Sequence, residues 1–362
     1  MILRSGLALL LLLSSPALAQ PRIIQLVDSL FEAELPLVVA PIIYHSPETS
    51  WGLGASVSYV FKTSATETRV SNINTQFVRT RLGQSLFRLS SDIFSPGEKW
   101  FFQFYLGYRN YVDRFYGIGP LSLENQRENY SYRSLVQDLS SLRKFGNGLF
   151  AGLNMRYVRQ YDLQAANGTS LNETLQGFNG INSWGIGPEF SWDTRNNIMS
   201  AQKGIYLHLL SRFHPGMGNE NPAFQSYQLD IRHYQPVGKH VWANRFKSEH
   251  KSGQPPFQEL ALAGGSNFGR GYFEGRYRDR HLVGLESELR WQLWRMLGLT
   301  TFSSIFQLGN TPDQWFANPW RMSYGMGLRC FVNQADRLVV RLDYARTLEG
   351  HQAFYLSVHE AF

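Results

Sequence analysis

Short stretches in which apolar and polar residues alternate recur along this chain from about residue 37 onward. In 51–61, Trp51, Leu53 and Val57 share one face, and glycines and serines occupy most of the other. The segment 338–345 repeats the pattern. Because successive side chains of a strand point to opposite faces, a period of two predicts β-strands rather than helices.

Applied to the whole chain, this period predicts about sixteen antiparallel strands, the even number typical of membrane barrels. The predicted strands are 37–45, 51–62, 67–80, 84–94, 99–109, 129–142, 148–161, 184–193, 203–213, 224–235, 240–250, 281–293, 299–308, 321–332, 336–346 and 352–362.

The polar face of these strands decides between two all-β architectures. A soluble sandwich turns a solvated face rich in lysine and glutamate outward. Here the polar positions hold glycine, serine, asparagine, glutamine and arginine, with few lysines. This composition is typical of a polar lumen behind a lipid-facing wall, so the pattern favours a transmembrane antiparallel β-barrel.

The connections between the predicted strands sort by length. Short ones read SPGE, FGNG, PVG and NQAD, and long ones are 110–128, 162–183, 251–280 and 309–320. An even number of strands places both ends of the barrel on the periplasmic side, and the short connections lie there too. Short periplasmic turns and long outer loops are expected of an outer-membrane barrel.

The first residues have the features of a secretory signal peptide. One arginine precedes a leucine run, and Ala17 and Ala19 supply the small residues of a cleavage site. We therefore expect a signal peptide at 1–19, a short periplasmic segment at 20–36 and an outer-membrane barrel at 37–362. An uncleaved anchor is the alternative, but the apolar run is short for a membrane span.

Composition gives no sign of a disulfide framework or of a nucleic-acid partner. The chain has 362 residues with 14% aromatics, and its mean hydropathy is −0.28. Cys330 is the single cysteine, so no intramolecular disulfide forms. Arginines lining a lumen and loops facing lipopolysaccharide account for the net charge of +7 without a nucleic-acid partner.

The last predicted strand carries an aromatic insertion signal. Phe354, Leu356 and Val358 share a face with Phe362, and Glu360 interrupts the row. A last strand that closes on an aromatic residue is the usual outer-membrane insertion signal.

The stretch GGSNFGRGYFEGRYRD, within the long connection 251–280, resembles the signature loop of the BamA/TamA superfamily of outer-membrane assembly and secretion barrels. Gly269, Arg270, Gly271 and Tyr272 occupy its tetrad, with glycine in the usually apolar first place. Further motifs of that superfamily match in order, at Asp193 and Arg195, Asp230 and Arg232, and Glu286 and Glu288. The resemblance implies that the loop folds back into the lumen.

An arginine inside a barrel needs an anionic partner, because an unpaired buried charge is costly. Alternation places Glu286, Glu288 and Arg290 on the inward face of the strand after the loop, and Arg341 and Asp343 on that of a later strand. We expect Arg270 to pair with Glu288, with Glu286 as the second candidate.

Two departures from the superfamily bear on function. Gln307 stands where the resemblance implies an aspartate, which leaves the loop with one anionic partner fewer. Residues 20–36 are too few for the periplasmic POTRA domains that typical members carry. We therefore expect client capture to use a periplasmic partner protein in place of those domains, the lumen, or the barrel wall.

No enzyme or metal signature appears. The sequence has no Gly-x-Ser-x-Gly elbow, no His-Glu-x-x-His and no cysteine pair. We expect no cofactor, no metal and no catalysis, and a barrel that handles unfolded outer-membrane or secreted proteins in contact with outer-membrane lipid. A passive or plugged pore that keeps only the fold is the alternative, and an outer-membrane barrel enzyme is a third.

Overall fold

The computed structural model describes residues 37–46, 50–64, 68–165, 170–198, 200–218, 221–314, 317–333 and 338–362. The predicted signal peptide and the segment 20–36 lie outside the described residues. Within the described part, no helix is long and apolar enough to cross a membrane.

Eighteen strands and four short 3-10 turns make up the described fold. The strands are β1 (Leu37–Ser46), β2 (Ser50–Phe61), β3 (Ser71–Thr80), β4 (Ser85–Phe94), β5 (Trp100–Phe115), β6 (Glu128–Gly146), β7 (Leu149–Ala165), β8 (Ile181–Asp193), β9 (Gly204–His214), β10 (Phe224–Val237), β11 (His240–Gly253), β12 (Ala261–Ala263), β13 (Tyr277–Asp279), β14 (His281–Gln292), β15 (Leu297–Gly309), β16 (Arg321–Asn333), β17 (Leu338–Thr347) and β18 (Gln352–Val358). The 3-10 turns are η2 (Pro96–Glu98), η3 (Glu124–Gln126), η4 (Phe257–Glu259) and η5 (Pro312–Gln314).

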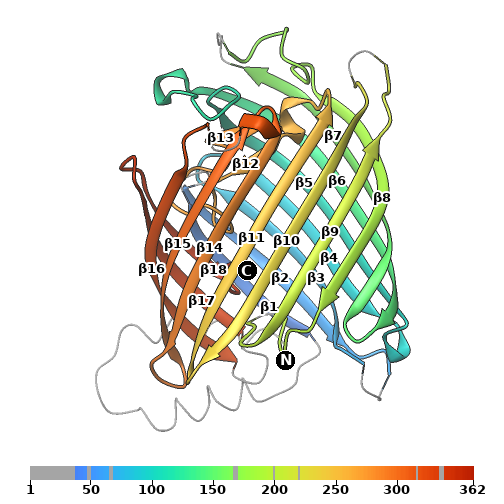
Figure 1. The fold of residues 1–362 in the computed structure, drawn as a ribbon, viewed down its shortest axis with the longest axis vertical. Coiled ribbons are helices and arrows are strands. Elements are labelled where there is room, and N and C mark those ends of the chain that lie inside the picture. The colour runs from blue at the N-terminus through green and yellow to red at the C-terminus, as the bar shows by residue number, and fades with distance from the viewer. Residues whose placement is uncertain are drawn as a thin grey trace.

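Sixteen of the strands form one antiparallel sheet that curves into a barrel with tilted strands (Figure 1). Each strand pairs with its neighbour in sequence, except that β11 pairs with β14 across the long connection that holds β12 and β13. The predicted architecture of about sixteen antiparallel strands is confirmed.

The connections divide the barrel into two ends. One end, called the turn end, carries the short turns 95–99, 147–148, 238–239 and 293–296; the loop end carries 116–127, 166–180, 254–280 and 310–320. The connections 62–70 and 194–203 are the longer exceptions at the turn end.

The alternation of faces is as predicted. Leu53, Phe77 and Leu285 are each more than half exposed on the outer wall, whereas Glu288 and Asp343 are fully buried inside. Apolar side chains on the outer face suit a bilayer, because lipid cannot satisfy polar groups.

Several predicted strand bounds need correction. β5, β6 and β7 run past the predicted 99–109, 129–142 and 148–161. Their ends continue to pair with one another beyond the length needed to cross the membrane. β3 begins at Ser71 rather than at 67. The loop itself contains two three-residue strands, which are too short to show a period.

The predicted strand 352–362 ends early, at Val358. His359 has a φ of +70°, which turns the chain away from the strand direction. Phe362 is 8% exposed and lies against Tyr234 inside the barrel, so it does not share the lipid face of Phe354. The side chain of Val358 lies outside the described side chains.

Candidate functional site

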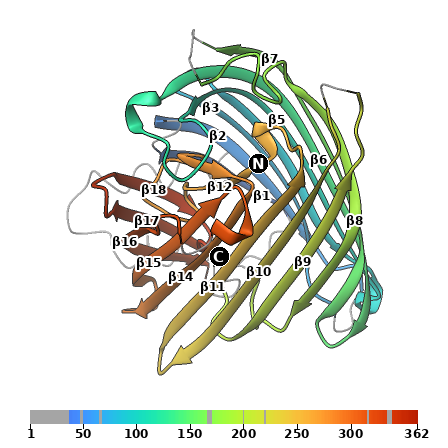
Figure 2. The ribbon, with the colours of Figure 1, turned by 45° about the horizontal axis from the view of Figure 1, so that its top comes forward.

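The connection 254–280 folds into the barrel rather than away from it. Figure 2 shows β12 and its neighbouring segments inside the ring of strands. β12 pairs with β13, and the chain between them forms an apolar cluster with the wall. That cluster comprises Ala261, Ala263, Phe268, Tyr272, Tyr277, Leu282, Phe306 and Leu308.

Arg270 is the most deeply held charge of this loop, at 1% exposure. Its guanidinium donates to the Glu288 carboxylate of β14 and, at 2.8 Å, to Asp343 of β17. The guanidinium also lies 3.5 Å from the centre of the Phe302 ring. Two carboxylates and an aromatic face together offset the cost of burying the charge.

Tyr272 holds the other end of the tetrad. Its hydroxyl donates to the Glu349 carboxylate, and the same oxygen lies 3.2 Å from the Met322 carbonyl. Burial raises the pKa of Tyr272 above its ordinary value, as does the bond to Glu349. Burial also raises the pKa of Glu349, but hydrogen bonds from Tyr272 and Arg321 outweigh it and leave that pKa lowered. The phenol is therefore a donor to an ionised carboxylate.

The tetrad also contacts β18, the last strand of the sheet. The Gly271 N–H donates to the Tyr355 hydroxyl at 3.1 Å, and that hydroxyl lies 3.4 Å from the Tyr272 carbonyl. Loop residues 270–272 thus bind β14, β16, β17 and β18 at once.

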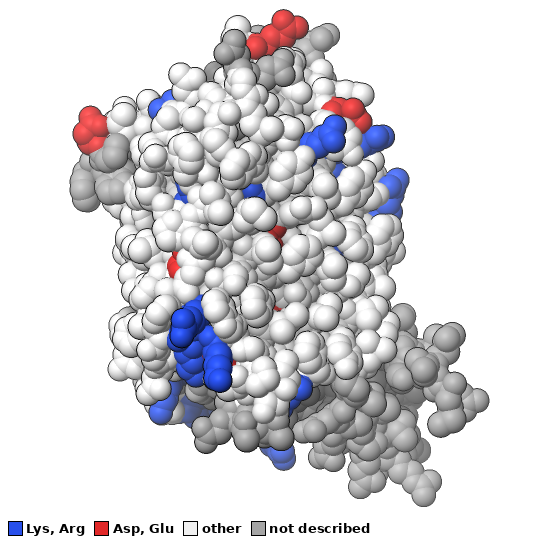
Figure 3. Space-filling view, turned by 90° about the vertical axis from the view of Figure 1, so that its right-hand side faces the viewer, with Lys and Arg blue, Asp and Glu red and all other residues white. Residues whose placement is uncertain are grey.

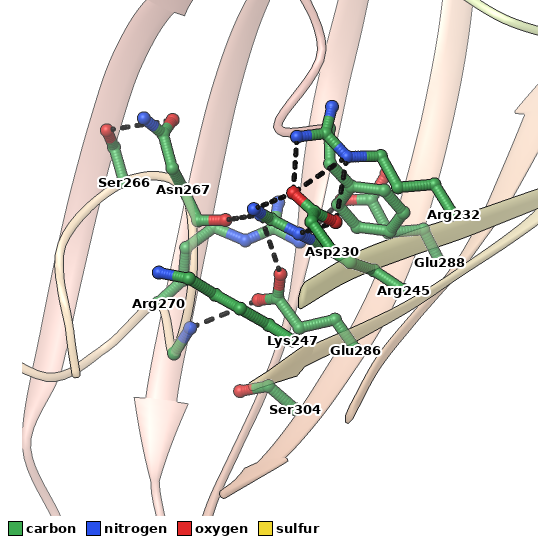
Figure 4. Close-up of polar contacts among 12 residues, drawn as sticks. Asp230, Arg232, Arg245, Lys247, Ser266, Asn267, Arg270, Glu286, Glu288 and Ser304 are labelled. Atoms are coloured by element: carbon green, nitrogen blue, oxygen red, sulfur yellow. Dashed lines mark hydrogen bonds and ion pairs between the residues drawn. The ribbon is translucent and has the colours of Figure 1, made fainter. Parts of the chain in front are cut away.

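A second group of charges holds the loop from β10 and β11 (Figure 4). Arg245 of β11 pairs with Asp230 at 2.7 Å and donates to the Asn267 carbonyl of the loop at 3.0 Å. Arg232 also pairs with Asp230, at 2.7 Å. Glu286 accepts the Gly269 N–H at 3.1 Å, so it binds the loop backbone instead of Arg270.

The remaining inward charges balance the same carboxylates. Arg329 and Arg341 bond to Asp343 at 2.5 and 2.8 Å, and Arg290 bonds to Glu288 at 2.8 Å. These two carboxylates therefore keep arginine partners of their own, whether or not the loop is bound.

Residues 360–362 lie within this network. Glu360 accepts from Arg329 at 2.8 Å, and the Phe362 carbonyl accepts from Arg290 at 3.0 Å. The charge that interrupts the apolar row of the sequence is therefore an inward residue.

Two sequence-predicted positions lie apart from Arg270. Asp193 and Arg195 pair with each other at 2.8 Å at the turn end, with Arg195 over the Tyr206 ring. Gln307 donates to the Asn318 carbonyl near the loop end. Register pairs Gln307 with Val283, whereas Glu288 lies opposite Phe302, five residues away along the strand.

Sequence reasoning missed the contributions of Arg245, Tyr355 and Glu349. Inward parity on β11 is a signal that could have identified Arg245. The alternation of β11 is hard to see in the sequence, because the outer face of that strand is polar too, with Asn244, Ser248 and His250. Tyr355 alternates with the exposed Phe354, so the sequence identifies it only as an ordinary inward aromatic residue.

The site has no acid–base or nucleophilic arrangement aimed at an open cavity. Its charges are buried and mutually paired, which suits a conformational lock. In the described part of the chain, no three His, Cys, Asp or Glu side chains are placed to hold a metal ion. The expected lack of a cofactor stays a prediction.

A family model for the Omp85 superfamily domain matches residues 51–358. No curated protein sequence matches the chain significantly.

Solved barrels resemble the structure at low sequence identity. BamA from Haemophilus ducreyi lacking POTRA domains 1-3 aligns with a TM-score of 0.58 and 11% identity over 90% of this chain and 70% of that one. CdiB from Escherichia coli aligns with a TM-score of 0.58 and 13% identity, over 90% and 63%. CdiB from Acinetobacter baumannii gives 0.55 and 11%, over 89% and 59%. At such identities the likeness concerns the fold.

Proposed function

Since the chain belongs to the Omp85 superfamily, we propose that it assists the insertion, assembly or translocation of outer-membrane or secreted proteins. Bacterial outer-membrane barrels make up this superfamily, and the outward apolar wall suits the same membrane. The proposed clients are unfolded protein segments, handled next to outer-membrane lipid and lipopolysaccharide. The proposal contains no catalytic step.

The proposed mechanism uses the seam between the first and last strands. The hydrogen-bonded order of the sheet runs from β1 to β18, and these two strands lie next to each other. A weakly paired seam opens sideways, and an incoming strand pairs with the exposed edge. Strand addition of this kind uses the free N–H and C=O groups of a sheet edge.

The observation that carries the proposal is that the loop bonds to the two strands beside this seam. Arg270 binds Asp343 of β17, and Gly271 binds Tyr355 of β18. The loop therefore holds the last two strands against β14. In our proposal, the bound loop holds the barrel in the conformation from which the seam between β1 and β18 opens.

The test is depletion of this protein in its own cell, with rescue by wild type or by Arg270→Ala. We expect depletion to lower the abundance of other outer-membrane proteins, wild type to restore it, and Arg270→Ala to fail. The variant should still fold, because Glu288 and Asp343 retain other arginines. Quantitative profiling of the outer membrane measures the result.

Arg212→Ala is the matched control. Arg212 is a buried inward arginine whose hydrogen bonds go to Asn154 and, at 2.9 Å, to Asp138 rather than to the tetrad 269–272. Full rescue by Arg270→Ala, or equal failure of both variants, would remove the role assigned to the loop.

The passive or plugged pore is the second candidate. Inward polar side chains on β3 to β5, such as Asn74, Gln76 and Gln103, are only partly buried, so that side of the lumen is less filled than the loop side. An unchanged membrane proteome after depletion would favour this alternative.

A further inference from the structure

Two neighbouring turns at the turn end border an open basic hollow on the barrel. The turn before β5 and the turn after β6 contribute its walls, and its volume is about 670 Å³. It is lined by Gly97, Lys99, Trp100, Arg143, Lys144 and Asn147, among others. Figure 3 shows Lys and Arg side chains toward both ends of the wall, this end included, and few charges between them.

The strand register brings these cations together. Trp100 and Arg143 are directly paired across β5 and β6, and the Lys144 N–H donates to the Lys99 carbonyl at 3.0 Å. A register irregularity between Lys144 and Gly146 follows at once. The cations therefore occupy positions fixed by the backbone.

Two carboxylates of the described residues lie near these turns, and other groups use both: Asp193 pairs with Arg195 at 2.8 Å and lies 3.8 Å from Arg69. Glu98 accepts from Lys144 at 2.8 Å, and from the backbone N–H and side chain of Arg69 at 2.9 and 3.1 Å. Lys99 and Arg143 are exposed, and no acidic side chain of the described residues forms an ion pair with either. The hollow thus presents two uncompensated positive charges.

The surroundings place these charges at the level of lipid headgroups. Trp100 is 42% exposed and Phe145 is 65% exposed beside them. Aromatic side chains gather where the hydrocarbon meets the headgroups, and a cation on the outer wall costs little only near that boundary. At the turn end of an outer-membrane barrel, the facing leaflet consists of phospholipid.

We propose that this hollow binds the phosphodiester of an anionic phospholipid, with Lys99 and Arg143 as the charges that recognise it and Trp100 packing beside the glycerol. Basic pockets at a membrane surface bind acidic headgroups in this way. The inference depends on how the barrel lies in the membrane and not on the assembly activity proposed above.

The test is native mass spectrometry of the delipidated, refolded barrel with equal amounts of phosphatidylglycerol and phosphatidylethanolamine. We expect wild type to retain phosphatidylglycerol preferentially. We expect Lys99→Gln with Arg143→Gln to weaken that binding about 25-fold, at about fivefold for each charge removed. Heat-modifiable gel mobility checks folding, and Lys99→Gln alone, with about a fivefold loss, replaces the double variant if that one does not fold.

Lys203→Gln with Lys239→Gln is the matched control, because both lysines are exposed at the same end and lie outside the hollow. We expect this control to bind like wild type. Equal losses in both double variants, equal retention of the two lipids, or displacement by inorganic phosphate in a competition arm would each overturn the proposal.

Discussion

At Gly269 the chain carries glycine where the superfamily loop usually has an apolar residue, and the local geometry explains the difference. Its φ is +70°, and a Cβ at this position would lie 2.9 Å from Cε1 of Phe306. Gly269 also donates its N–H to Glu286. A side chain here would strain the backbone and press on the ring that packs against Tyr272.

Replacing Gly269 with valine should therefore loosen the loop. We expect the left-handed backbone to cost about 1–2 kcal/mol, with a further cost from the contact with Phe306. Limited proteolysis within 254–280 and urea unfolding midpoints measure the effect.

Gly83→Val is the control, because Gly83 has a φ of +86° and nothing within 4 Å of the added Cβ. It should show the backbone cost alone. An equal loss in both variants would mean that the contact with Phe306 contributes nothing.

Among the elements, the short turn η2 shows how a buried carboxylate connects neighbouring segments at the turn end. Glu98 is 6% exposed, and Arg69, which bonds to it, lies 4.4 Å from the centre of the Phe94 ring. Burial raises the pKa of Glu98, but the hydrogen bonds from Lys144 and Arg69 outweigh it and hold the pKa below its ordinary 4.5. The ionised carboxylate thus joins the connections 62–70 and 95–99 to the end of β6.

This lowered pKa predicts a pH-dependent stability. The stabilisation is complete above the pKa of Glu98 in the unfolded chain and is lost as pH falls through its folded pKa. We expect Glu98→Gln to cost about 1–3 kcal/mol at neutral pH and little at about pH 2–3. Urea midpoints of the refolded barrel at both pH values test this.

Glu124→Gln is the comparison for that experiment. Glu124 pairs with Arg276 at 3.0 Å, but its side chain is 52% exposed, so solvent weakens the pair. We expect a small change at either pH. A deficit of Glu98→Gln that persisted at low pH would contradict the assigned charge state.

On the scale of the whole molecule, the inserted loop makes the barrel a filled structure on one side. The loop is tied to β10 and β11 through Arg245 and to the seam side through Arg270. The loop therefore obstructs its side of the lumen and confines an aqueous path to the less filled side along β3 to β5. Wild type should show low conductance in a planar bilayer.

Replacing residues 264–276 with a Gly-Ser turn between the paired β12 and β13 should open that path. The wall should remain folded, because Arg290, Arg329 and Arg341 still neutralise Glu288 and Asp343. We expect a large and steady conductance from the variant. Equal conductance of the variant and wild type would show that the loop does not obstruct the lumen.

The sequence by itself determined the strands, their faces and the inward position of Glu288 and Asp343. These follow from the period of two, which is a local property of extended backbone. It also pointed to Arg270 through the tetrad and to Glu288 as its partner.

Only the tertiary structure decided which inward charges meet. Arg270 and Asp343 are 73 residues apart, and Glu286 proved to bind the backbone of Gly269. Phe362 lies inside the barrel because the chain turns at His359, which alternation does not reveal. Alternation determines on which face of the sheet a side chain lies. The path of the loop across the lumen determines which of the inward side chains come into contact.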